Sequence, residues 1–183
     1  MTRAYRYILT HDSGMAPCPD GGLISLATCK TVIRRVARPG DWVLGFRPGS
    51  LERGLMLWAG KVAENMSHGE YQRRHSNRSD AVYRVGKDGD YERLDPAYHP
   101  SQAEMDRDVR EPVLLFDHTV SVYLNGQPAP LPAGLAHLAA AGRGHRVSEL
   151  STSELAELER WVTSLTPAAP PKRRGGRGSC RSC

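Results

Sequence analysis

Two segments in the first third of the chain carry apolar side chains at every second position, and this period of two predicts β-strands. The pattern runs through residues 3–9 (RAYRYIL) and 41–46 (DWVLGF), which are rich in aromatic and β-branched residues. Residues 54–62 (GLMLWAGKV) are almost continuously apolar, which predicts a buried strand after the turn near residues 48–49. We therefore expect a sheet that is built early in the chain.

One loop and one helix separate the first two strands. Residues 10–29 are rich in Gly, Pro, Asp and Ser, and a loop of that length is often functional. Residues 30–38 (KTVIRRVAR) place apolar side chains on one side of a helix that ends at Pro39-Gly40. Lys30, Arg34 and Arg38 recur every four residues and form a basic stripe on the same helix.

The rest of the chain predicts more strands of the same sheet and two helices. Residues 68–112 are highly charged, and we expect short structured pieces at most in them. Composition and patterning predict strands in four later segments. These are residues 81–85, 90–94, 113–116 and 119–125. A short helix is expected from Pro132 to about Gly142, and a final helix begins at the capping-box pattern of Ser151 and Glu154.

Length and composition fit one compact domain. The chain has 183 residues, of which 39% are hydrophobic and 25% are charged, and a domain of this size folds without disulfides or metal. The whole net charge of +5 resides in residues 166–183, which hold five basic residues and no acidic one. Because this segment is rich in Pro, Gly and Arg, we expect a folded domain over residues 1–165 and a disordered basic tail over 166–183.

Several classes of protein are excluded by what the sequence lacks. No apolar run approaches the roughly 18 residues of a membrane helix, and the first residues lack the apolar stretch of a signal peptide. We therefore expect a cytoplasmic protein without a membrane partner. Phosphate-binding loops, dinucleotide-binding glycine motifs and the Gly-x-Ser-x-Gly motif are absent. The four cysteines lack zinc-type spacing, so we expect no metal and no cofactor.

Several short motifs resemble one known family. Residues 10–19 read T-H-D-x-G-x-A-P-x-P, Cys29-Lys30 precedes the basic helix, and Gly40-Asp41-Trp42 follows it. Residues 113–132 and 142–147 look like later blocks of the same family. Over about residues 3–150 the chain thus resembles the nucleotide modification associated domain family, its second named type. The resemblance implies a link to systems that make or handle modified nucleobases, and it names no reaction.

The chain departs from that family pattern at two places. Residues 79–83 read Ser-Asp-Ala-Val-Tyr where a Gly-Asp-Asn-aliphatic-Tyr block is expected, so that Asp80 and Tyr83 are retained. Cys18 stands where relatives tend to have Asn. The basic helix followed by GDWVLGF and LMLWAGKV is also similar to PUA-like and EVE-like domains. That likeness implies an α+β fold built on a mostly antiparallel, PUA-like bent β-barrel with peripheral helices. In such folds, bases bind in a pocket at the mouth of the barrel.

The loop after the first strand holds the residues best suited to acid–base chemistry. His11 exchanges a proton near neutral pH, and Asp12 can orient it or accept a hydrogen bond from a base. The structural alternative is that Asp12 and Ser13 hydrogen-bond the backbone of a tight turn at Gly14. Cys18 is either a small buried thiol or, if His11 lies beside it, a nucleophile.

A ligand pocket is expected where the loop 10–19 meets residues 40–42. Trp42 either stacks on a base or belongs to the apolar core stripe of its strand, and Asp41 either accepts from a base or caps a turn. The basic stripe of the helix either holds phosphates or is a solvated face. The ligand-binding candidates are Thr10, Ser13, Gly14, Cys18, Lys30, Arg34, Asp41 and Trp42.

These residues lead to three functional hypotheses. The first is a domain of a modified-base system that binds a nucleobase or nucleotide by aromatic stacking and polar loop contacts. The alternative is a small enzyme that acts on a nucleotide or modified base, with His11 and Asp12 as its acid–base pair. The third is an accessory protein whose late helix and basic tail recruit another component. The partners implied are a nucleotide or nucleic acid and other components of a base-modification system.

Overall fold

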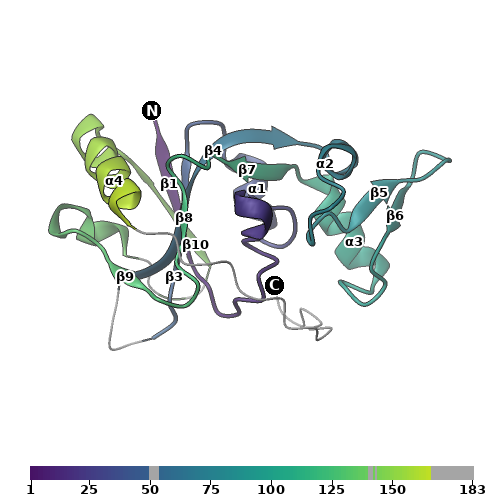
Figure 1. Ribbon diagram of the computed structural model, residues 1–183, viewed down its shortest axis with the longest axis horizontal. Helices are drawn as coiled ribbons and strands as arrows, with labels where there is room; N and C mark the ends of the chain where they lie inside the picture. Colours follow the sequence, from purple (N-terminus) through teal and green to yellow (C-terminus); the bar gives the residue numbers. More distant parts are fainter. Residues whose placement is uncertain (50–53, 140–141, 143, 166–183) are drawn as a thin grey trace.

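The computed structural model describes residues 1–49, 54–139, 142 and 144–165. A large sheet occupies the middle of the molecule, with α4 at one end and a group of short helices and strands at the other (Figure 1). The predicted disordered tail, residues 166–183, lies outside the described residues. Within the described part of the chain, no helix has the length and apolar character needed to span a bilayer.

The sheet has eight strands and is mostly antiparallel. Its strands are β1 (Arg3–Ile8), β2 (Ser25–Leu26), β3 (Trp42–Phe46), β4 (Leu55–Met66), β7 (Val113–Phe116), β8 (Val122–Tyr123), β9 (Ala129–Pro130) and β10 (His145–Glu149). The strand order is β10-β1-β3-β4-β7-β2, and β8 and β9 each pair with β4. Only β1 and β3 run parallel among the pairings of these described strands.

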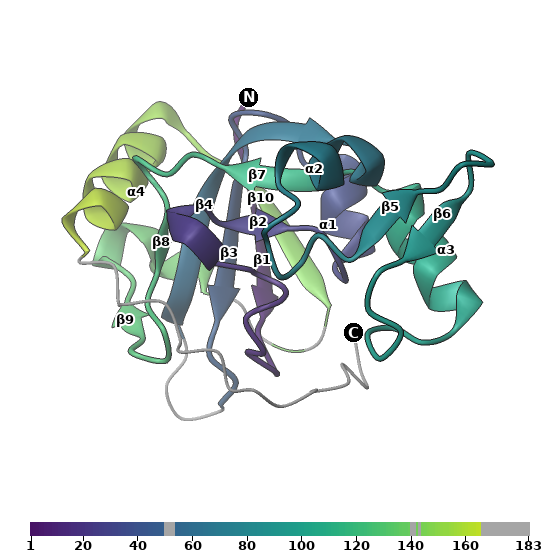
Figure 2. The same ribbon diagram turned by 45° about the vertical axis from the view of Figure 1, so that its right-hand side comes forward.

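The predicted α+β class and the mostly antiparallel pairing are confirmed, but closure into a barrel is not found. Among the described strands, β10 and β2 end the strand order and do not pair with each other. The remaining elements are α1 (Thr31–Val36), α2 (His68–Arg74), α3 (Gln102–Arg110), α4 (Thr152–Ser164), η1 (Asp20–Gly22), η2 (Ala133–Leu138), β5 (Tyr83–Val85) and β6 (Tyr91–Arg93). β5 and β6 form a hairpin apart from the large sheet. Figure 2 shows α2, α3, β5 and β6 together at the end opposite α4.

The sequence patterns predicted most of the sheet and missed two helices. α2 and α3 lie within residues 68–112, where only short pieces were expected. Ser67 caps α2, and Ser101 and Glu104 form a capping box at the start of α3. The capping box of α3 has the same Ser-x-x-Glu spacing as the box from which α4 was predicted. The sequence therefore contained a signal for the start of α3. The high charge of this segment obscured the signal, because α2 has only seven residues and α3 buries only Met105 and Asp108.

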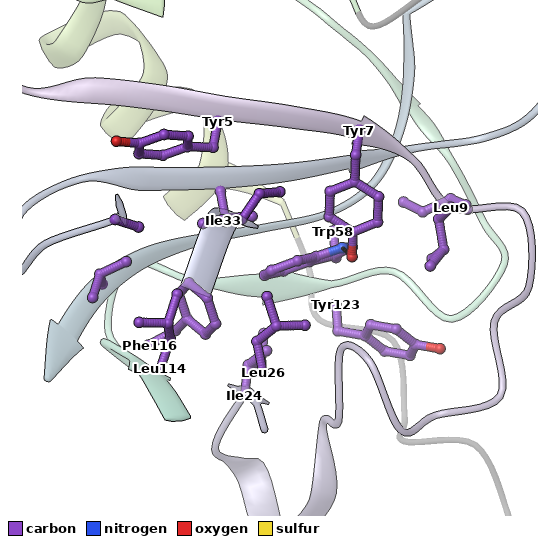
Figure 3. Packing of buried hydrophobic residues seen from close by; sticks show 14 residues of the cluster. Tyr5, Tyr7, Leu9, Ile24, Leu26, Ile33, Trp58, Leu114, Phe116 and Tyr123 are labelled. Atoms are coloured by element: carbon purple, nitrogen blue, oxygen red, sulfur yellow. Dashed lines mark hydrogen bonds between the residues drawn. The ribbon is translucent and has the colours of Figure 1, made fainter. Parts of the chain in front are cut away.

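Two apolar clusters cover the two faces of the sheet. Trp42, Leu44 and Phe46 of β3 pack on one face against residues of α4 and η2. Tyr5 and Tyr7 of β1 point to the other face, as the period of two requires. There they pack with residues of α1, β2, β4, β7 and β8 (Figure 3). α1 is therefore held on the face that carries Tyr7.

Trp58 of β4 is the central side chain of this second cluster. Its indole Nε1 donates to the Tyr7 hydroxyl at 3.1 Å, and its ring meets Phe116 edge-to-face at 5.2 Å between centroids. Figure 3 shows the indole nitrogen beside the Tyr7 oxygen. Gly45 of β3 lies opposite Trp58 in the register. A Cβ added to Gly45 would stand 2.1 Å from the indole Nε1, so only glycine leaves room for this ring.

We predict that Gly45→Ala destabilises the protein by about 3 kcal/mol, because the fixed indole cannot move away from a new methyl group. Gly134→Ala is the matched control, since its Cβ would meet only the flexible carboxylate of Glu157. Its free energy of unfolding should stay within about 1 kcal/mol of the original value. Urea unfolding of the three proteins measures both values. Equal losses of stability in the two variants would contradict the close fit at Trp58.

Candidate functional site

The loop that leaves β1 presents one exposed carboxylate in a fixed position. The Tyr123 hydroxyl of β8 donates to Asp12 Oδ2 at 2.7 Å, although Asp12 itself is exposed. Tyr123 is 5% exposed. Burial and the neighbouring Asp12 charge both raise the pKa of Tyr123 above its ordinary value, so the hydroxyl keeps its proton and remains a donor. The Asp12 carboxylate is thus oriented and accessible.

An ammonium group lies near the same end of β1. Lys30 is half-buried, and its Nζ lies 4.8 Å from the centroid of the Tyr7 ring, within the range of a cation–π contact. The negative charge of Asp12 contributes to raising the pKa of Tyr7, after burial, which places Asp12 in the surroundings of this ring. We call Tyr7, Asp12, Lys30 and Tyr123 the loop site. It combines a hydrogen-bond acceptor with a cationic donor.

The other predicted residues of the loop take several positions. Thr10, His11 and Ser13 are exposed, and Gly14 is half-buried with a φ of 74°. The Asp12 carboxylate accepts a hydrogen bond from Tyr123. The hydrogen-bond partner that the structure gives to Asp12 is therefore Tyr123, and not His11 as in the predicted acid–base pair. Cys18 is buried, with its Sγ 3.5 Å from the Ser79 hydroxyl. Burial raises the pKa of the Cys18 thiol to about 11, which leaves it protonated and unreactive at neutral pH.

The expected meeting of the loop with Asp41 and Trp42 is wrong. β1 runs parallel to β3 with Ala4 opposite Trp42 and Ile8 opposite Phe46, so Trp42 lies at the end of β1 opposite to the loop. Four residues of strand separate the two ends by roughly 13 Å. Trp42 is fully buried on the other face of the sheet, so its indole packs the core and presents no face to a base. Asp41 accepts from the backbone N–H groups of Arg3 and Arg38 and joins two segments of the chain.

The predicted phosphate role of Arg34 is also wrong, because its side chain is fully buried. Its guanidinium donates to the carbonyl oxygens of Cys29, Asp108, Glu111 and Pro112 and to the ring of His68. Burial lowers the pKa of Arg34 to about 10 against the opposite effect of Asp108 and Glu111, so the group stays cationic at neutral pH. Only Lys30 and Arg38 of the predicted basic stripe remain at or near the surface.

Asp108 of α3 is the acidic centre of this buried network. Its Oδ1 accepts from the Cys29 backbone N–H at 3.0 Å and lies 3.4 Å from Arg34 Nη1. Its Oδ2 accepts from the Tyr83 hydroxyl at 2.9 Å and lies 2.6 Å from His99 Nδ1. Burial alone raises the pKa of Asp108, but the His99 and Arg34 interactions outweigh it and hold this pKa below its ordinary value. The carboxylate is therefore ionised inside the protein.

His68 of α2 completes the surroundings of Arg34. Its Nε2 lies 2.7 Å from Arg34 Nη2, and burial and the Arg34 charge lower the pKa of His68 to about 3. The imidazole is neutral at physiological pH, and its Nε2 lone pair accepts from the guanidinium. His68 also packs edge-to-face on Tyr83 at 5.4 Å between ring centroids. A neutral histidine thus satisfies one more donor of a buried cation.

A second buried network fixes the middle of the loop 10–29. Asp80 accepts from the hydroxyl groups of Ser25 and Tyr71, and Arg78 lies 3.4 Å from the same carboxylate. Arg78 also donates to the carbonyl oxygens of Cys18 and of Asp20. Burial lowers the pKa of Arg78, but the Asp80 charge outweighs it and keeps the guanidinium protonated. Ionic and hydroxyl contacts therefore attach this loop to the 68–112 segment.

The sequence reasoning missed the residues that organise the interior. Asp80 and Tyr83 were noticed only because they are retained from a family block, and each belongs to one of the two buried networks. Cys29 was noticed as part of the Cys29-Lys30 motif. Asp108 and His99 carry no local signal, because they meet Cys29 and Arg34 only after the chain folds back across more than 60 residues. A predicted helix over residues 102–110 would have placed Asp108 on a helix, but not beside Cys29 and Arg34.

The comparisons with known proteins give a family for the chain. A family model described as nucleotide modification associated domain 2 matches residues 1–172. This match confirms the resemblance carried by the loop 10–19 and the later motifs. No curated protein and no solved structure matches the chain. Within the described residues, no group of His, Cys, Asp and Glu side chains is arranged to hold a metal ion.

We predict that Arg34→Lys lowers the free energy of unfolding by about 3–5 kcal/mol. A lysine keeps the charge but cannot reach six acceptors with one ammonium, and buried acceptors are left without donors. The control is Arg35→Lys at the adjacent position, whose side chain is 60% exposed, and its stability should change by less than about 0.5 kcal/mol. Chemical unfolding measures both. Similar midpoints for the two variants would refute the central role of Arg34.

We predict that stability falls as the pH drops below about 6.5, the ordinary pKa of histidine. Because the native pKa of His68 is about 3, the unfolded chain binds a proton there that the native protein does not. Between these two values this residue contributes a slope of up to about 1.4 kcal/mol per pH unit. His68→Gln, compared with the original protein at pH 7.5 and at pH 5, should lose this part of the slope. An unchanged slope would contradict a neutral His68.

Proposed function

The chain belongs to the nucleotide modification associated domain 2 family, and we propose that it binds a nucleotide or nucleobase at the loop site. The family description supports an association with nucleotide modification systems. The observation that carries the proposal is the exposed Asp12 carboxylate, fixed by the Tyr123 hydroxyl in the surroundings of Tyr7, whose ring also carries the Lys30 ammonium. Recognition at this site is polar, because Trp42 lies in the core.

Asp12 supplies the acceptor for the edge of a base. A carboxylate accepts hydrogen bonds from exocyclic amino groups of bases, as in the carboxylate–cytosine pairing. Its hydrogen bond to Tyr123 restricts the direction of the carboxylate before any ligand arrives, which reduces the entropy lost on binding. Because burial keeps the Tyr123 hydroxyl protonated, this orientation persists across the neutral pH range.

Lys30 supplies the positive charge for a phosphate. The backbone of Lys30 has a φ of 42°, in the left-handed region, and its half-buried stem carries the ammonium over the ring of Tyr7. A point charge of this kind positions a phosphate without reading the base. The loop site therefore suits a ligand that carries an amino-bearing heterocycle and an anionic group, which are the two parts of a nucleotide.

We predict saturable binding of at least one of a panel of probes, namely the four deoxynucleoside monophosphates, 5-hydroxymethyl-dCMP and a short single-stranded oligonucleotide. Asp12→Asn and Lys30→Gln should each weaken it by about tenfold, since each removes one charge-assisted contact. Affinity should fall as salt rises, because phosphate contacts are screened. Isothermal titration calorimetry at two salt concentrations measures these effects.

The control variant is Arg38→Gln, which alters an exposed cation of the predicted basic stripe outside the loop site. It should bind like the original protein, and so should Trp42→Phe if its fold is retained, because Trp42 lies on the other face of the sheet. The proposal fails if no probe binds saturably. It also fails if the double variant of Asp12 and Lys30 binds with the original affinity.

A further inference from the structure

The large sheet ends at β10, and the outer side of this strand is open. β10 pairs with β1 and closes the strand order, so no other described strand lies along its outer side (Figure 2). An edge strand presents unpaired N–H and C=O groups, which proteins usually protect with lysine, proline or a bulge. β10 reads His-Arg-Val-Ser-Glu and pairs with β1 in an unbroken register. It is therefore a regular strand that lacks these three protections.

The pairing with β1 determines which backbone groups of β10 point outward. The Leu150 N–H donates to the Thr2 carbonyl oxygen at 2.9 Å, so in this antiparallel register the even-numbered residues of β10 bond β1. The outward-facing residues are His145, Val147 and Glu149. Within the described residues, a single contact reaches their backbone groups, from the Arg146 guanidinium to the His145 carbonyl oxygen at 3.0 Å. That oxygen has a second lone pair for another donor.

The side chains of these three residues share the face of the sheet that carries Tyr5 and Tyr7. Val147 lies opposite Tyr5 and is 51% exposed, which makes it the most exposed large apolar side chain in any described helix or strand. His145 lies two residues before this valine and Glu149 lies two residues after it. The row therefore has an imidazole at one end, a carboxylate at the other and an apolar centre.

We propose that β10 pairs antiparallel with β10 of a second copy of this chain, with the two-fold axis at Val147. Val147 then lies opposite Val147 of the second copy, and His145 of each copy lies opposite Glu149 of the other. All of these positions face outward, so each pair exchanges two backbone hydrogen bonds. One axis therefore satisfies the backbone, brings the exposed valines together and places each imidazole beside a carboxylate.

The neighbouring registers lack this agreement. An axis at Arg146 places two guanidinium groups opposite each other, and like charges directly opposite destabilise a strand pair. An axis at Ser148 places Val147 opposite the carboxylate of Glu149 and leaves His145 beyond the paired strand. The axis at Val147 is thus the one of the three in which each side chain of the row meets a compatible neighbour.

The occupant of the edge is a second copy because the strand is complementary to itself. Its charged ends have opposite sign, so inverting the strand brings each end to its opposite. A pairing through one strand of five residues buries little surface, and the dimer is therefore weak and reversible. The inference concerns β10 and does not depend on the proposed function of the loop site.

Sedimentation velocity from about 5 to about 500 µM tests whether the dimer forms. In the original protein the dimer fraction should rise with concentration. Val147→Lys should weaken the dimer at least about tenfold, because two ammonium groups then lie opposite each other. Val85→Lys is the matched control, since it alters a valine of β5 that is 43% exposed, and it should dimerise like the original protein.

Two results of this experiment overturn the inference. One is an original protein that stays monomeric at the highest concentration, which would leave the edge to a strand of another protein. The other is a dimer that Val147→Lys does not weaken. Circular dichroism and unfolding midpoints confirm that the compared proteins are folded.

Cysteine variants test the register. Val147→Cys places two thiols opposite each other in a hydrogen-bonded pair, where Cα atoms lie about 5.5 Å apart, within the range of a disulfide. Mild oxidation should join the two copies at position 147, as identified by mass spectrometry of the linked peptides. Glu149→Cys is the control, because the two positions 149 lie about 14 Å apart in this register and should not be joined. Linkage at position 149 without linkage at position 147 overturns the register.

Exchange of the charges tests the pairing of His145 with Glu149. His145→Glu places carboxylates opposite each other twice in each dimer and should weaken it by about tenfold. Adding Glu149→Lys to this variant restores opposite charges, and the affinity should return to within about threefold of the original. A double variant that dimerises no better than His145→Glu alone overturns this pairing. The rescue distinguishes a specific strand pair from association that depends only on the exposed valine.

Discussion

The buried guanidinium of Arg34 is the interaction on which the rest of the structure depends. A cation taken out of water is tolerated only when its donors and charge are satisfied, and here four carbonyl oxygens, a neutral imidazole and the Asp108 carboxylate do so. These acceptors come from the start of α1, from α2 and from the end of α3. A single side chain therefore fixes how the sheet and the segment 68–112 meet.

This arrangement helps to explain how the loop 10–29 is ordered. Its second half packs Ile24, Leu26 and Ala27 into the core, and polar contacts add to this packing. Arg78 bonds the carbonyl oxygen of Cys18, Asp108 bonds the N–H of Cys29, and Asp80 accepts from the Ser25 hydroxyl. Such contacts have strict geometry, whereas apolar packing tolerates small shifts. These hydrogen bonds therefore fix the position of the loop closely. A group that binds a ligand needs a position fixed with similar precision.

The sequence patterns revealed the elements whose signal is local. Strand period two located β1 and β3, and the Ser-x-x-Glu spacing located α4. The same reasoning placed Arg34 on an exposed stripe that either holds phosphates or is solvated, whereas its side chain is buried. The helical pattern shows which residues share a face and not which face meets the rest of the protein. Trp42 failed as a ligand residue for a related reason. The parallel register of β1 and β3 decides which end of a strand lies near the loop, and no local pattern encodes that register. The loop 10–19, in contrast, does place Asp12 at an accessible position.

The loop 10–29 connects the proposed binding site to the buried Arg34 network through the covalent chain. Lys30 directly follows Cys29, whose backbone N–H is bonded to Asp108 and whose carbonyl oxygen is bonded to Arg34. Asp12 enters the loop near its start and Cys29 lies at its end, while the Ser25 and Cys18 contacts fix the part between them. The buried network that holds Cys29 and the contacts that orient Asp12 thus act on the same segment, which gives the two charged residues of the proposed binding site, Asp12 and Lys30, a shared physical support.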